Sequence, residues 1–267
     1  MIVATQEEAR KLPWVADKAR RKSKWIYDNL WVRNRRGGPW PDPEGTERIQ
    51  VQAPFGELDV KVLRGKQGKG TVVLSHPDRR YGGHWFVKEG YVATLHEAGY
   101  TVLWYDNPRY GQGDGGSPYL AENVLNVAAL AREVDEGPVR VIGVSLGSFA
   151  AAIAAPHMPW VDKLVLESPY PDFMSWYDGK GHSVERVALS GWRLMFGKDF
   201  QELQTPKTLA GAPADILVVA SPDDSVTSAA LSRQSVAGVP HTWLDVPGEH
   251  LHLWQDPAYR QAVLDFF

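Results

Sequence analysis

The pattern of apolar and polar residues changes at about residue 70. Before that point, residues 48–53 and 58–62 alternate apolar and polar side chains on either side of a Pro-Phe-Gly turn, which is typical of an antiparallel hairpin. After it, short runs are almost continuously apolar, which is typical of strands covered on both faces in a parallel sheet. These runs are 71–75, 100–105, 139–143, 161–166, 215–220 and 241–246.

Stretches with helical spacing alternate with the apolar runs. They span residues 85–98, 120–135, 146–155, 227–237 and 257–267. Strand–helix alternation after a hairpin predicts an α/β protein with a doubly wound, mostly parallel eight-stranded sheet. The connection 169–213 is too long for a simple loop and is rich in aromatic residues, so we expect it to be a lid inserted in the domain.

The first 46 residues differ in character from the rest. Residues 1–40 carry ten Lys/Arg and four Asp/Glu, in a chain whose net charge is −3. A basic arm can bind nucleic acid, but this one also contains four tryptophans, which favour packing. Its apolar stripe has helical spacing (Val15, Ala19, Ile26 and Leu30). We therefore expect a helical extension (1–46) that packs on the main domain (47–267) or on the second subunit of a homodimer, without a nucleic-acid partner.

The composition excludes several classes of protein. Hydrophobic residues make up 43% and charged residues 23%, as in ordinary globular proteins, and no apolar run is long enough to span a membrane. The first residues do not resemble a secretory signal. The chain has no cysteine, which excludes disulfides, thiolate metal sites and a cysteine nucleophile. We therefore expect a cytoplasmic protein.

The segment Gly143-Val144-Ser145-Leu146-Gly147 carries the strongest chemical signal. It follows a predicted buried strand and opens an alanine-rich predicted helix, the context in which Gly-x-Ser-x-Gly forms a nucleophile elbow. The glycines leave room for the crowded backbone of a sharp turn. The N–H groups at the start of the helix can stabilise an oxyanion.

A nucleophilic serine needs a base and an orienting carboxylate. His250 follows the last predicted strand, and His252 is its rival. The segment 220–226 follows another strand and offers Asp224, which we favour, or Asp223. Glu167, at the end of a third strand, is a further alternative. Ligands meet such sheets at the carboxyl ends of the strands, so these groups can converge on Ser145.

The sequence resembles the α/β-hydrolase superfamily over residues 47–267. The likeness rests on the segments 71–77 and 99–113, on the Ser145 elbow, and on the order Ser…Asp…His. The resemblance implies an oxyanion hole completed by a backbone N–H after the third strand. Pro77 stands where that N–H is usual and has none, so the donors are expected to be Asp78 and Leu146.

The resemblance implies a serine hydrolase that acts through an acyl-enzyme, an esterase or thioesterase without a cofactor or metal. Its expected partner is a small-molecule ester or thioester with an apolar or aromatic acyl group. The residues expected to bind it are Tyr81, Trp176, Tyr177, Trp192 and Met195. The alternatives are an acyltransferase, a lyase or cyclase of a biosynthetic pathway, and a peptidase.

Overall fold

The protein, seen in a computed structural model, is described over residues 40–53, 56–66, 68–117, 120–172, 175 and 203–267. The described residues contain one eight-stranded sheet. Its strands are β1 (Glu47–Ala53), β2 (Gly56–Leu63), β3 (Thr71–Ser75), β4 (Thr101–Tyr105), β5 (Val139–Val144), β6 (Val161–Glu167), β7 (Asp215–Ala220) and β8 (Thr242–Asp245).

The strands lie in the order β1-β2-β4-β3-β5-β6-β7-β8. The hairpin β1–β2 is antiparallel and β2 also runs antiparallel to β4, whereas every pair from β4 to β8 is parallel. This arrangement confirms the predicted α/β class and the mostly parallel eight-stranded sheet. All the parallel strands end at the same edge, and that edge carries the polar residues discussed below.

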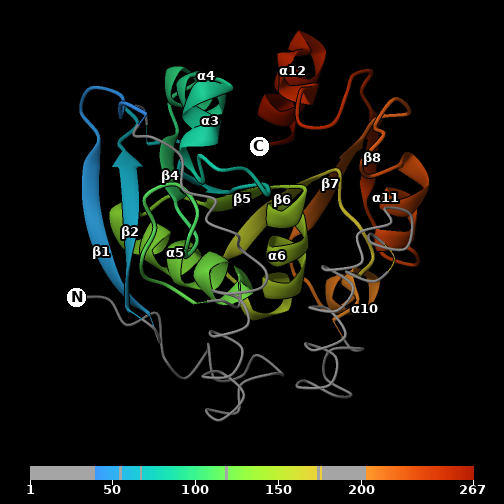
Figure 1. Ribbon diagram of the computed structural model, residues 1–267, viewed down its shortest axis with the longest axis horizontal. Coiled ribbons are helices and arrows are strands. Elements are labelled where there is room, and N and C mark those ends of the chain that lie inside the picture. Colours follow the sequence, from blue (N-terminus) through green and yellow to red (C-terminus); the bar gives the residue numbers. More distant parts are fainter. Residues whose placement is uncertain (1–39, 54–55, 67, 118–119, 173–174, 176–202) are drawn as a thin grey trace.

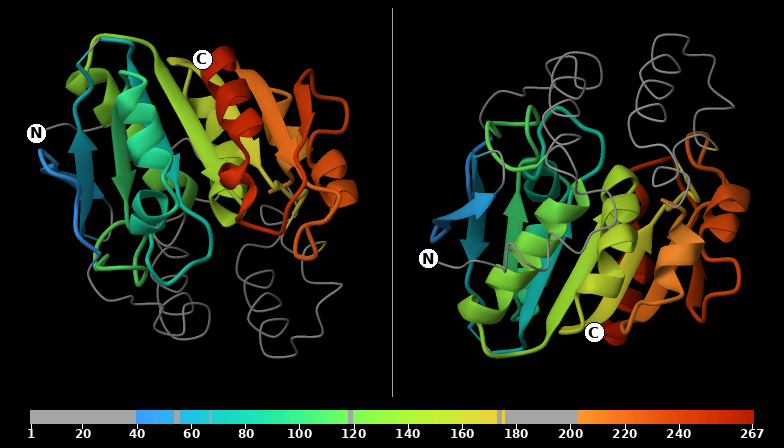
Figure 2. Two further views of the ribbon diagram at one scale, coloured as in Figure 1. Left: turned by 90° about the horizontal axis from the view of Figure 1, so that it is seen from above. Right: turned by 90° about the horizontal axis from the view of Figure 1, so that it is seen from below.

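Helices cover both faces of the sheet (Figure 1). They are α3 (His84–Lys88), α4 (Tyr91–Glu97), α5 (Leu120–Val134), α6 (Leu146–Ala154), α10 (Thr205–Leu209), α11 (Ala229–Ser235) and α12 (Pro257–Phe266). Figure 2 shows α3, α4 and α12 on one face and α5 and α6 on the other. The covering on both faces explains why the central residues of the parallel strands are almost continuously apolar.

Alternate residues of the central strands supply two separate cores. Val73 and Val141 pack with α5 and α6, whereas Leu74 and Ile142 pack with α3, α4 and α12. The period of two along each strand therefore divides one apolar run between two layers. The two cores fix α6 against the sheet, and the first residue of α6 follows Ser145.

One predicted helix is wrong in extent. The stretch 85–98 forms two helices, α3 and α4, which are separated at Glu89 and Gly90. Gly90 has a φ of 88°, a left-handed conformation that ends the first helix and redirects the chain. The hydrophobic pattern continues through this break, because both helices bury their apolar faces in the same core.

Several predictions concern residues outside the described part of the chain. These are the helix of the N-terminal extension and most of the lid, so the boundaries at residues 46/47 and 169–213 stay predictions. Among the described helices, none combines the length and the apolar character that crossing a membrane requires.

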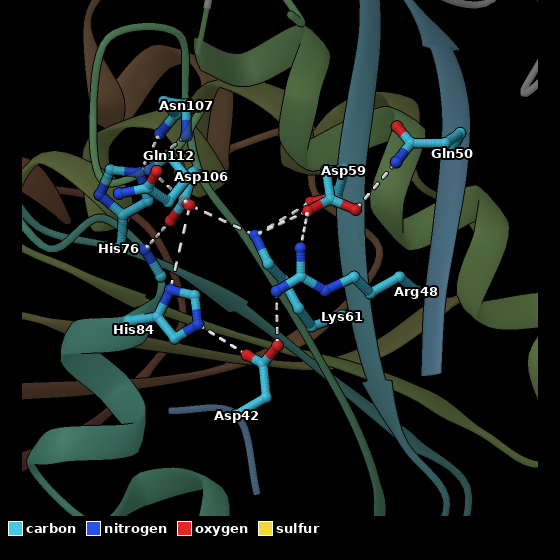
Figure 3. A network of polar contacts seen from close by, with 11 residues as sticks. Asp42, Arg48, Gln50, Asp59, Lys61, His76, His84, Asp106, Asn107 and Gln112 are labelled. Atoms are coloured by element: carbon cyan, nitrogen blue, oxygen red, sulfur yellow. Dashed lines mark hydrogen bonds and ion pairs between the residues drawn. The ribbon is translucent and has the colours of Figure 1, made fainter. Parts of the chain in front are cut away.

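A buried ion pair links the antiparallel edge of the sheet to its parallel part (Figure 3). Lys61 of β2 is 1% exposed, and its Nζ lies 3.2 Å from Asp106 Oδ2, beyond the end of β4. Asp59 lies at the same distance from that Nζ. Asp106 also accepts hydrogen bonds from the N–H groups of Gly83 (2.7 Å) and Gln112 (3.1 Å). The carboxylate thus joins two loops and a strand.

The same network of polar contacts extends through His84 to Asp42, near the first described residues. His84 Nε2 lies 2.6 Å from Asp42 Oδ1, and Arg48 Nη2 lies 2.6 Å from Asp42 Oδ2. Burial tends to raise the pKa of Asp42, but the hydrogen bonds from Arg48 and His84 outweigh it and lower that pKa. Asp42 therefore fastens residues 40–46 to β1 and α3.

We expect Lys61→Met to destabilise the protein by about 3–5 kcal/mol, because it leaves the buried Asp106 carboxylate without its cation. The double variant Lys61→Met/Asp106→Asn should recover part of this loss. Urea unfolding followed by circular dichroism measures both.

The control is Asp215→Asn, which removes the partner of Lys163 at a side chain that is 73% exposed. It should cost at most about 1 kcal/mol. Equal losses in Lys61→Met and the control would contradict this account of the buried pair.

Candidate active site

Ser145 lies on a sharp turn between β5 and α6. Its backbone has φ 52° and ψ −114°, a conformation that non-glycine residues seldom adopt. The Ser145 N–H donates to the carbonyl of Glu167 at the end of β6 (2.8 Å), and its own carbonyl accepts from the N–H groups of Ser148 and Phe149. These bonds on both sides stabilise the strained residue where strand changes to helix.

The glycines that flank Ser145 allow α6 to approach the strand ends. A Cβ on Gly147 would overlap the carbonyl oxygen of Ser75 at the end of β3, and one on Gly143 would lie 2.6 Å from the Gly147 carbonyl oxygen. Neither position accepts a larger residue without movement of the backbone. The spacing of the motif therefore follows from the tight packing of the helix start on two strands.

The side chains of Ser145, His250 and Asp224 form one hydrogen-bonded chain. His250 Nδ1 lies 2.7 Å from Asp224 Oδ2, and His250 Nε2 lies 3.1 Å from Ser145 Oγ. A carboxylate only accepts, so Nδ1 carries the ring proton and Nε2 can accept the proton of the serine hydroxyl. All three residues are buried. The arrangement can deprotonate a serine that attacks an electrophile.

Asp224 accepts four hydrogen bonds in this chain. Oδ1 accepts from the N–H groups of Val226 (2.8 Å) and Thr227 (2.7 Å), and Oδ2 accepts from His250 and from the hydroxyl of Ser168 (2.9 Å). Burial tends to raise the pKa of Asp224. The hydrogen bond and the charge of His250, with the bonds from Thr227 and Ser168, outweigh burial and lower that pKa. The carboxylate is therefore stable as an anion.

The rivals of these residues lie in other surroundings. Asp223 Oδ2 accepts from the Gly248 N–H (3.2 Å), at the turn that precedes His250. His252 is exposed, whereas His250 is buried. Of the alternatives left open by the sequence, the structure brings Asp224 and His250 to Ser145.

The orientation of the Asp78 N–H, in the loop after β3, follows from the hydrogen bonds of the preceding carbonyl. Asn107 N–H donates to Nε2 of the buried His76 (3.0 Å), so the ring proton is on Nδ1, which donates to the Pro77 carbonyl (2.8 Å). The Arg79 N–H donates to the same carbonyl (2.7 Å). Because the Pro77–Asp78 peptide is trans, the Asp78 N–H points away from both donors.

The side chain of Asp78 has a partner of its own. Its Oδ1 accepts a hydrogen bond from the hydroxyl of Tyr110 (2.8 Å), and the Tyr110 ring packs on His76 with centroids 5.0 Å apart. The hydroxyl withdraws negative charge from this carboxylate. Burial lowers the pKa of His76, which stays neutral beneath the loop. Tyr110 and His76 together fix the position of Asp78, the residue after Pro77.

Comparisons with known proteins agree with this architecture, although no family model matches the sequence. A serine hydrolase without a lid from Xanthomonas campestris, which its description places among the α/β hydrolases, superposes with a TM-score of 0.55. It is 17% identical and covers 85% of this chain and 95% of its own. The chain has the α/β-hydrolase fold.

Two further proteins are similar to this chain. An esterase of Pyrococcus furiosus superposes with a TM-score of 0.67 at 14% identity and covers 86% of this chain and 94% of its own. A Mycobacterium tuberculosis protein described as a candidate non-heme bromoperoxidase, BpoC, is 27% identical over 221 residues, which cover 64% of this chain and 84% of BpoC. Its crystal structure superposes with a TM-score of 0.59.

The α/β-hydrolase fold accounts for where the predicted site residues lie. Ser145, Asp224 and His250 follow β5, β7 and β8, Asp78 lies in the loop after β3, and Leu146 is the first residue of α6. Tyr81 lies in the loop after β3, with its ring 6.2 Å from that of Trp40. The other predicted substrate-binding residues lie outside the described residues: Trp176, Tyr177, Trp192 and Met195.

Sequence reasoning did not find three residues that contact this machinery. Ser168 donates to Asp224, Tyr110 donates to Asp78, and Asn107 donates to His76. The signal for Ser168 and Asn107 is their place one or two residues beyond a buried strand, at the same edge of the sheet. Within the described residues, no group of three His, Cys, Asp or Glu side chains is arranged to hold a metal ion.

A second carboxyl group lies buried beneath Ser145. Glu167 Oε2 accepts hydrogen bonds from the hydroxyls of Tyr91 (2.6 Å) and Tyr259 (2.8 Å). Burial raises the pKa of Glu167 to about 7, assisted by the charge of Asp224 and opposed by the two tyrosine hydroxyls. The sequence left Glu167 open as the carboxylate that orients the base, but its side chain is held between two tyrosines, and His250 contacts Asp224 instead.

The raised pKa of Glu167 predicts a pH-dependent contribution to stability. Below pH 4.5 both the folded and the unfolded states bind the proton. Between pH 4.5 and 7 only the folded state keeps it, so the free energy of unfolding falls as pH rises, by an amount on the order of 3 kcal/mol in all. The loss should be complete above pH 7.

Glu167→Gln has no such proton and should escape this loss. The difference in urea midpoint between the wild type and Glu167→Gln should therefore change in favour of the variant from pH 5 to pH 8. Glu249→Gln, at an exposed side chain, serves as the control. A difference that stays constant over this range would show that Glu167 titrates as an ordinary carboxyl group.

Proposed function

We propose that this protein is a serine hydrolase that cleaves an ester or thioester through an acyl-enzyme on Ser145. The observation that carries the proposal is the buried chain of hydrogen bonds from Ser145 through His250 to Asp224. The esterase and the serine hydrolase that share the fold support it. The unusual backbone of Ser145, which projects the hydroxyl from a strand–helix turn, supports it further.

In the proposed reaction, Ser145 Oγ attacks the carbonyl carbon while His250 Nε2 takes the hydroxyl proton. Asp224 stabilises the imidazolium that forms and fixes its orientation. The N–H groups of Leu146 and Asp78 bind the developing oxyanion. His250 then gives the proton to the leaving alcohol or thiol, and it later activates the water that releases the acid. This chemistry needs no cofactor.

The two proposed oxyanion donors are positioned by different means. Leu146 is the first residue of α6, where backbone N–H groups have no acceptor within the helix and the helix dipole favours negative charge. The orientation of the Asp78 N–H depends on the Pro77 carbonyl, which His76 and Arg79 hold. Such fixed donors lower the barrier because they need no reorganisation during the reaction.

The similarity to BpoC supports a second candidate, in which hydrogen peroxide replaces water at the acyl-enzyme. The product is then a peracid, which can oxidise bromide to hypobromite as the peracid returns to the carboxylic acid. Bromination of phenol red in the presence of peroxide, bromide and a short carboxylic acid tests it. Bromination that Ser145→Ala abolishes would favour this activity, and hydrolysis without bromination would favour the esterase.

A panel of p-nitrophenyl esters of increasing acyl length, with acyl thioesters alongside, tests the main proposal. Ser145→Ala should lower kcat on the order of 10⁴- to 10⁶-fold while the far-ultraviolet circular dichroism is unchanged. Product analysis separates hydrolysis from acyl transfer. Activity within tenfold of the wild type would remove Ser145 from the nucleophile's role.

The adjacent aspartates provide a matched pair of variants. Asp224→Asn should lower kcat on the order of 10⁴-fold, because the amide cannot stabilise the imidazolium and favours the wrong tautomer of His250. Asp223→Asn should lower it less than tenfold, since among the described contacts the Asp223 side chain accepts from the backbone of Gly248, in the turn before His250, and not from His250 itself. Equal losses in the two variants would reverse the assignment of Asp224.

A further inference from the structure

The end of β6 contacts two members of the proposed triad at once. The carbonyl of Glu167 accepts the N–H of Ser145 (2.8 Å), and the hydroxyl of the next residue, Ser168, donates to Asp224 Oδ2 (2.9 Å). The Ser168 N–H donates in turn to the carbonyl of Val219 in β7 (2.8 Å). Ser168 is fully buried. Two consecutive residues therefore set the backbone of the nucleophile and the side chain of the acid.

The backbone of Ser168 is strained in the way expected of a functional position. Its φ is 49°, the left-handed region, which a residue with a Cβ adopts only at a cost of roughly 1 kcal/mol or more. No glycine stands here, although glycine would adopt this conformation freely. What serine adds at this position is a hydroxyl, which donates to Asp224 Oδ2. The same oxygen atom also accepts from His250.

We propose that Ser168 is a positioning residue of the triad, whose hydroxyl shares Asp224 Oδ2 with His250 and so sets how strongly Asp224 stabilises the protonated imidazole. This inference rests on the proposed function of Ser145, His250 and Asp224. A donor on a carboxylate oxygen disperses its charge, and less of that charge is then available to a second donor. Removal of the hydroxyl should therefore strengthen the hold of Asp224 on protonated His250.

Other ionisable groups around the pair do not replace this effect. Glu167 carries its own donors, Tyr91 and Tyr259, and Asp223 accepts from the Gly248 backbone. Glu249 is exposed next to His250. Among the described contacts, Asp224 Oδ2 accepts hydrogen bonds from the Ser168 hydroxyl and from His250, and from none of these other groups.

The test follows the rate at which a fluorophosphonate probe labels Ser145 between pH 5 and pH 9. This rate needs neutral His250 but no knowledge of the natural substrate. In Ser168→Ala the lower limb of the pH profile should move to higher pH by roughly half a unit, because the imidazolium is more stable.

Ser168→Gly separates the hydroxyl from the strained backbone. It removes the same hydroxyl, and glycine adopts the positive φ without strain. The test therefore does not depend on Ser168→Ala, in which the strain remains, folding well. Both variants should show the same shift of the lower limb. A shift in Ser168→Gly without one in Ser168→Ala would assign the effect to the backbone and overturn the proposal.

Ser232→Ala is the matched control. This serine is as buried as Ser168, and its hydroxyl donates to the carbonyl of Pro169, next to Ser168 but away from Asp224. Its profile should coincide with that of the wild type. A wild-type protein that the probe does not label at Ser145 would overturn the proposed function and this inference with it. A labelled wild type whose lower limb coincides with that of Ser168→Ala would overturn this inference alone.

Discussion

The close approach of α6 to the ends of β3 and β5 is the constraint on which the site depends. Gly147 lies against the Ser75 carbonyl, and this contact leaves Ser145 in a backbone conformation that only its surroundings stabilise. The two cores on either side of the sheet supply the required rigidity. Because α6 is packed tightly on the strands, the Ser145 hydroxyl is held at the edge of the sheet where the segments after β7 and β8 place Asp224 and His250.

Two carboxyl groups near this edge are kept in opposite states by their neighbours. Asp224 accepts two backbone N–H groups, a hydroxyl and an imidazole, and its pKa is lowered. Glu167 has only two tyrosine hydroxyls in a fully buried place, and its pKa is raised to about 7. Their proximity reinforces the difference, because an ionised Asp224 makes the ionisation of Glu167 less favourable. Below pH 7, one anion and one neutral acid therefore lie close together in the same interior.

The sequence predicted the sheet well, and it also predicted that Ser145, Asp224 and His250 follow buried strands, because both follow from local patterns. Continuous apolar runs identify buried strands, and Gly-x-Ser-x-Gly identifies the turn after β5. The break between α3 and α4 could not be predicted, because both helices keep one apolar face across Gly90. The roles of Ser168 and Tyr110 could not be predicted either. Each depends on which side chain a distant loop brings within 3 Å, and periodicity does not contain that information.

Pro77 lies in the loop after β3, and its carbonyl is held by two donors. A proline has no N–H, and its carbonyl would be free to rotate with the next peptide plane. Here two donors, the neutral ring of His76 and the Arg79 N–H, hold that carbonyl. The Asn107 N–H donates to Nε2 of His76 and so favours the tautomer that donates from Nδ1. Asn107 follows Asp106, the carboxylate paired with the buried Lys61. The ion pair at the antiparallel edge thus supports the orientation of the Asp78 N–H, through a chain of contacts that runs along the strand ends toward Ser145.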